Sequence, residues 1–123
     1  MTRRAMALHE AHNKVVWWSA PVEIASAFAR LGRMKQLSPD DLARARQLAQ
    51  ALADSWSVIQ PSDVLRTEAA QLVNRFDLRA ADALQLAAAL VWCEHVPAGR
   101  VFLTADQKLR EAALLCGFDA RPM

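Results

Sequence analysis

Apolar residues recur along this chain with two different spacings, and the two kinds of segment alternate. Short, nearly continuous apolar runs stand at 14–20, 56–60 and 100–105, a pattern typical of strands that are buried on both faces of a sheet. Between them lie longer segments with apolar residues three or four positions apart, the spacing of a helix that packs one face on a core. The alternation predicts an α/β fold in which helices cover a mostly parallel sheet.

Capping residues mark the starts of several helices. In LSPDDLARARQLAQALADSW, Ser38 is the expected N-cap and Pro39 the first helical residue. The segment PSDVLRTEAAQLVNRF begins in the same way, with Ser62 or Asp63 as its cap. Further helices are expected over 2–12, 21–33, 79–95 and 106–117, and a last edge strand over 118–123.

The composition limits the number of domains and the class of protein. A chain of 123 residues that is 54% hydrophobic and holds only 3 Gly suits one compact domain over 1–123 and argues against disorder. The net charge of +2 provides no bulk attraction to nucleic acid, so RNA binding has to come from locally clustered Lys and Arg. With no signal peptide pattern and no apolar run of about 18 residues, we expect a cytoplasmic protein without a membrane anchor.

Three carboxylates stand where expected strands end or helices begin. Asp82 lies in the otherwise apolar segment AADALQLAAALVW, Asp106 directly follows VFLTA, and Glu23 begins the helix after VVWWS. Each has an ordinary structural explanation, because an acid in the first turn or at the N-cap stabilises a helix. Their shared placement at one edge of a parallel sheet, where open α/β proteins bind ligands, also predicts a carboxylate cluster.

Such a cluster requires a counter-charge. Hard oxygen ligands favour Mg²⁺ or Mn²⁺, ions that keep some of their waters and bind substrate phosphates. These ions activate water and stabilise in-line displacement at phosphorus. A carboxylate cluster at this edge would therefore be able to hold an ion that supports displacement at phosphorus.

Two blocks of the chain, LRAADALQLAAAL and VFLTADQKLREAALLCGF, resemble the C-terminal half of PIN-domain proteins, and above all the VapC-type toxins of bacterial toxin–antitoxin systems. WWSAPVEIASAFAR is similar to the second strand of that family and the acid-bearing helix after it. The resemblance implies a three-layer α/β/α fold and a Mg²⁺- or Mn²⁺-dependent endoribonuclease. By matching position it makes Glu23, Asp82 and Asp106 the expected catalytic metal ligands. It makes Thr104 a residue whose hydroxyl either positions a metal ligand or contacts the substrate.

The family pattern begins with a strand that ends in an acid, and this sequence holds no such element. In the family that strand is central to the sheet, and its Asp is a principal metal ligand. Three explanations stay open: a true start upstream of Met1, a truncated gene, or a strand supplied by another chain. We favour the first. For the chain as given we expect weak binding of Mg²⁺ or Mn²⁺ and slow or absent RNA cleavage, because reaction rates depend steeply on site geometry.

The resemblance also implies partners. The expected substrate is RNA, whose backbone Arg79 and Lys108 would hold, and the expected regulator is a cognate antitoxin protein. A homodimer is expected through the helices over 21–56. The alternative function is a catalytically inactive PIN-like module that binds an antitoxin or a second copy of itself. A purely helical interaction domain is a third interpretation, which the strands VVWWS and VFLTA oppose.

Overall fold

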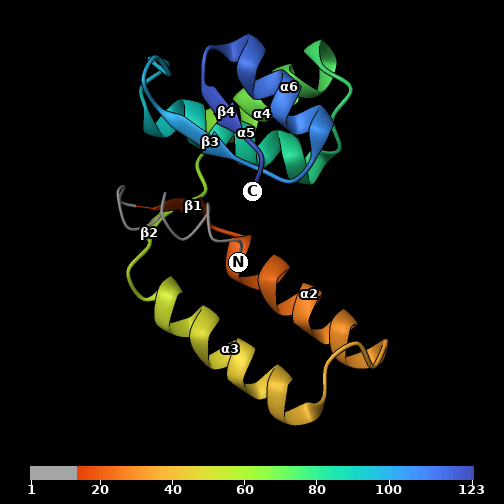
Figure 1. Ribbon diagram of the computed structural model, residues 1–123. Coiled ribbons are helices and arrows are strands. Elements are labelled where there is room, and N and C mark those ends of the chain that lie inside the picture. Colours follow the sequence, from red (N-terminus) through yellow and green to blue (C-terminus); the bar gives the residue numbers. More distant parts are fainter. Residues whose placement is uncertain (1–13) are drawn as a thin grey trace.

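Residues 14–123 are described in the computed structural model shown in Figure 1, and the helix expected over 2–12 lies outside this range. The fold is mixed α/β, as predicted, and each helix and strand expected within 14–123 is present. In chain order the elements are β1 (Val15–Trp17), α2 (Ala20–Arg33), α3 (Pro39–Ala53), β2 (Ser57–Ile59), α4 (Asp63–Arg75), α5 (Ala80–Trp92), β3 (Val101–Leu103), α6 (Gln107–Cys116) and β4 (Asp119–Arg121). No helix among these residues is both long enough and apolar enough to span a membrane.

The four strands are short and form two separate sheets. β1 pairs in parallel with β2, with Val16 opposite Val58, and β3 pairs in parallel with β4, with Phe102 opposite Ala120. The parallel pairing agrees with the prediction, but the expectation of one continuous sheet is wrong for residues 14–123. Within this range no strand joins the two pairs, so each sheet keeps an edge without a neighbouring strand.

Helices α4, α5 and α6 build most of the core. Leu65, Leu86 and Leu109, one from each of these helices, are almost fully buried, and β1 adds Trp17. The prediction that the strands are buried on both faces is wrong for β2, where Val58 is 40% exposed. The reason is that α2 and α3 pack mainly on each other and leave β2 partly uncovered.

The pair α2 and α3 forms a helical hairpin that projects away from the α4–α6 core (Figure 1). The two helices approach closely at Gly32, where an added Cβ would lie 2.8 Å from Leu42 Cδ2. Neither helix contains a buried residue, and apolar side chains such as Val22 and Leu48 are exposed. The hairpin is therefore held to the rest of the molecule mainly through the ends of β1 and β2.

Candidate functional site

Asp82 lies at the accessible end of a buried helix. It occupies the first turn of α5, after the N-cap residue Arg79, and is itself half-buried. The same helix buries Ala83, Leu86, Ala87, Ala88 and Leu90. These apolar residues fix α5 in the core, and the first turn then holds the carboxylate at the edge of that core.

Asp106 lies between β3 and α6 and caps the helix. Its Oδ1 accepts a hydrogen bond of 2.8 Å from the N–H of Leu109. The buried hydroxyl of Thr104 accepts a bond of 3.1 Å from the N–H of Asp106, and Arg110 donates to the carbonyl of Thr104 at 3.0 Å. Thr104 thus fixes the backbone that carries Asp106. Asp106 also caps α6, which is the structural role expected of it without any metal site.

Asp82 and Asp106 line the same cleft, which has a volume of about 430 Å³. The expected RNA-binding residues Arg79 and Lys108 line it as well. The Lys108 ammonium forms an ion pair of 2.7 Å with Asp77, and both side chains are exposed. Asp77 is a cleft residue that the sequence pattern does not single out, because its partner Lys108 is far away along the chain.

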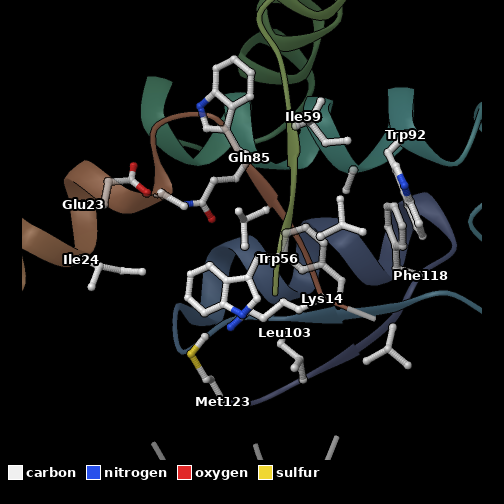
Figure 2. A pocket seen from close by; sticks show the side chains of 18 of the residues that line it. Lys14, Glu23, Ile24, Trp56, Ile59, Gln85, Trp92, Leu103, Phe118 and Met123 are labelled. Atoms are coloured by element: carbon white, nitrogen blue, oxygen red, sulfur yellow. Dashed lines mark hydrogen bonds between the residues drawn. The ribbon is translucent and has the colours of Figure 1, made fainter. Parts of the chain in front are cut away.

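Glu23 lies in the first turn of α2 and lines a different cavity. Gln85 of α5 reaches it across the space between the two helices, and the Gln85 Nε2 donates to the Glu23 Oε2 at 3.2 Å (Figure 2). Gln85 stands one turn after Asp82 on the same helix. The hydrogen bond therefore connects Glu23 to the helix that carries Asp82, although the two carboxylates do not share a cleft.

The three carboxylates interact electrostatically. Partial burial and the neighbouring Asp106 raise the pKa of the Asp82 carboxyl group above its ordinary value; Arg79 opposes the shift and Glu23 adds to it. Like charges act on a carboxyl group in this way only when they are near. The structure thus brings Asp82 and Asp106 together and places Glu23 within electrostatic range of Asp82.

A divalent cation would relieve this repulsion. Among residues 14–123 no group of three or more His, Cys, Asp or Glu side chains is arranged as a metal site. Mg²⁺ is commonly held by only one or two carboxylates together with substrate phosphates and water. The oxygen donors of Asp82 and Asp106 fit an ion bound in that way, and Glu23 is a third carboxylate near the pair.

No family model, no curated protein and no solved structure matches the chain. The likeness to PIN-domain proteins therefore depends on the residues quoted above. The cleft that Asp82 and Asp106 share is observed in the structure and does not depend on that likeness.

Proposed function

We propose that this protein is a metal-dependent endoribonuclease toxin with a PIN-like three-layer α/β/α fold. The observation that carries the proposal is the cleft shared by Asp82 and Asp106, with Glu23 close enough to raise the pKa of Asp82 further. Clustered acids of this kind are costly to keep charged, and a functional cation is one reason to retain them. An antitoxin protein and cytoplasmic location are parts of the same proposal.

The side chains that would hold Mg²⁺ or Mn²⁺ are Asp82 and Asp106, with Glu23 as a third. When bound, such an ion activates water and stabilises negative charge at phosphorus. Thr104 acts through Asp106, since its hydroxyl bonds the backbone N–H of that residue. Gln85 likewise positions Glu23, because its side-chain amide donates a hydrogen bond to the Glu23 carboxylate.

Two cations of the cleft suit an RNA backbone. Arg79 and Lys108 line the cleft beside the acids, and phosphate contacts orient a nucleic acid without reading its sequence. Lys108 is paired with Asp77, but an exposed ion pair is weak and exchanges readily with another anion. A phosphate can therefore replace Asp77 as the partner of Lys108.

The test is cleavage of a mixture of RNAs in Mn²⁺, with EDTA as the metal-free control. We expect slow cleavage by the full chain that EDTA abolishes. Asp82→Asn and Asp106→Asn should each reduce it to background, and the second variant should keep its fold because Asn caps helices as well as Asp does. Asp40→Asn is the matched control, since Asp40 also lies in the first turn of a helix but in the α2–α3 hairpin.

Full activity in Asp82→Asn would show that the acids are misassigned. Because slow or absent cleavage is expected of this chain, absence of cleavage favours the second candidate only when Mn²⁺ binding is absent as well. That candidate is an inactive PIN-like module that binds an antitoxin or a second copy of itself. One observation supports that candidate. The α2–α3 hairpin buries no residue and exposes apolar side chains, namely Val22, Met34 and Leu48, with Trp18 next to it.

A further inference from the structure

Asp77 adds another carboxylate to the cleft that Asp82 and Asp106 line. It lies in the segment between α4 and α5, and its Oδ2 accepts a hydrogen bond of 2.7 Å from the Lys108 ammonium. Arg79 and Lys108 are the two cations among the described residues that line this cleft. A carboxylate of the protein itself therefore holds one of the two groups that would bind an RNA phosphate.

The backbone fixes Asp77 at this position. The N–H of Leu78 donates to the carbonyl of Phe76 at 2.9 Å, which makes Asp77 the central residue of a γ-turn. The side chains on either side of it, Phe76 and Leu78, are half-buried and pack against the core. Because both neighbours are anchored, the Asp77 carboxylate stays beside the cleft even when Lys108 leaves it.

Stability of the fold does not explain why this ion pair is present. The Lys108 side chain is 68% exposed and that of Asp77 is 89% exposed, and exposed pairs add little to the free energy of unfolding. Asp63 and Arg66 of α4 form another exposed ion pair, but neither of them lines the cleft. The position of the Asp77–Lys108 pair in the cleft is what distinguishes it.

Both members of the pair are charged near neutral pH. The hydrogen bond and the charge of Lys108 hold the pKa of the Asp77 carboxyl group below its ordinary value of 3.8. The same contact raises the pKa of the Lys108 ammonium; Asp106 adds to this shift and Arg79 opposes it. A phosphate that approaches Lys108 therefore has to displace a charged carboxylate.

We propose that Asp77 is an internal competitor of the substrate: it holds Lys108 until an RNA phosphate displaces it, and it thereby sets how tightly the cleft binds RNA. This role of Asp77 rests on the proposed function in one respect, namely that the ligand of the cleft is RNA. Asp77 acts through Lys108, so it is a positioning residue that affects substrate binding and not the chemical step.

Asp77 opposes a bound phosphate in two ways that can be separated. Its charge repels the phosphate directly, and its carboxylate occupies the ammonium that the phosphate needs. Direct repulsion acts whatever group the RNA binds, and it is screened by salt. Competition requires Lys108, so the effect of removing Asp77 should depend on whether Lys108 is present.

The test measures binding of a fluorescein-labelled single-stranded oligouridylate to the full chain by fluorescence anisotropy. EDTA prevents metal-dependent cleavage, and about 0.1 M salt screens charges that are more than about 10 Å apart. Asp77→Asn should bind the RNA about threefold to fivefold more tightly than the native chain. Asp63→Asn is the matched control, because it removes the same charge from an exposed ion pair outside the cleft, and it should bind as the native chain does.

Lys108→Met shows whether the gain depends on the ammonium. This variant should bind RNA more weakly than the native chain, and adding Asp77→Asn to it should improve binding by less than about twofold. An equal gain in both backgrounds would overturn the proposal in favour of direct repulsion. Unchanged or weaker binding by Asp77→Asn would also overturn it, as would absence of RNA binding by every variant.

Cleavage in Mn²⁺ separates this role from the proposed function. Tighter binding by Asp77→Asn without cleavage by any variant would leave Asp77 as a competitor for RNA and count against the ribonuclease. Where cleavage is measured, Asp77→Asn should lower KM about threefold to fivefold and leave kcat unchanged. A lower kcat would overturn the proposal, because Asp77 would then contribute to the chemical step itself.

Discussion

At the scale of single residues, opposing effects meet at the carboxyl group of Asp82. The dipole of α5 and the guanidinium of Arg79 favour its charged form, while partial burial, Asp106 and Glu23 disfavour it. The unfavourable effects are the larger, because the pKa of Asp82 is raised overall. Charged Asp82 therefore destabilises the fold in the absence of a cation.

This balance predicts a pH-dependent stability. The folded chain binds the Asp82 proton more tightly than the unfolded chain, so the contribution of Asp82 to the free energy of unfolding falls as pH rises from the ordinary pKa of 3.8 through the raised value. The Asp82→Asn variant does not lose stability in this way as the pH rises, because its side chain cannot ionise. Urea unfolding in EDTA should show a stability difference in favour of Asp82→Asn that grows from about pH 3 to about pH 7. A difference that does not change with pH would contradict the prediction.

Two glycines with positive φ form a matched pair for a backbone prediction. Gly117 ends α6 at φ 108°, and a Cβ added there would meet Pro97 Cγ at 3.0 Å. Gly99 has φ 79° and nothing within 4 Å of the added Cβ. Urea unfolding should show Gly99→Ala destabilised by about 1 kcal/mol from backbone strain, and Gly117→Ala by more. Equal losses would mean that contact with Pro97 has no effect.

At the scale of helices, α3 and α4 begin alike but are held differently. The hydroxyl of Ser38 accepts from the N–H of Asp41, and that of Ser62 accepts from the N–H of Leu65, both at 3.1 Å. α4 buries Leu65, Ala69 and Leu72, whereas α3 buries no residue. The two caps therefore make the same local hydrogen bond, but only the cap of α4 belongs to a helix that contributes residues to the core.

Replacing each cap by alanine separates local from global stability. Ser62→Ala should lower the global free energy of unfolding by about 1 kcal/mol, since α4 unfolds together with the core. Ser38→Ala should leave the global value nearly unchanged and instead speed hydrogen exchange of amides in α3, which opens by itself. An equal global loss for both variants would show that the α2–α3 hairpin unfolds together with the core.

At the scale of the whole molecule, the α2–α3 hairpin is the surface we expect to pair with a second copy. Val22 is 70% and Leu48 61% exposed, and exposed large apolar side chains are candidates for an interface. Light scattering should find a dimer at concentrations on the order of ten micromolar. The double variant Val22→Glu with Leu48→Glu should be monomeric.

Its control is Val64→Glu with Leu115→Glu, two residues of similar exposure outside the hairpin. The control should remain dimeric, because it adds the same charge to a different surface. A monomeric native chain would contradict the dimer directly. Loss of the dimer in the control alone would instead place the dimer interface on α4 and α6.

The local elements were predictable because their causes are local. Ser38 and Ser62 cap the helices that follow them, and strands are found at the three apolar runs and over 118–123, where they were expected. The first-turn positions of Glu23 and Asp82 also follow from sequence alone. Asp77 was not predicted, since its ion pair with Lys108 depends on how the segment before α5 meets α6.

What the sequence determined by itself is the order of helices and strands, their caps, and the placement of acids next to strand ends. These depend on spacing and on neighbours a few residues away. Tertiary structure alone decided that the strands form two sheets, that Asp82 shares a cleft with Asp106 while Glu23 lines another cavity, and that α2 and α3 stay outside the core. The physical reason is that pairing and burial are contacts between distant segments. Each segment can satisfy its local preferences equally well whether or not a neighbouring strand is there to pair with it.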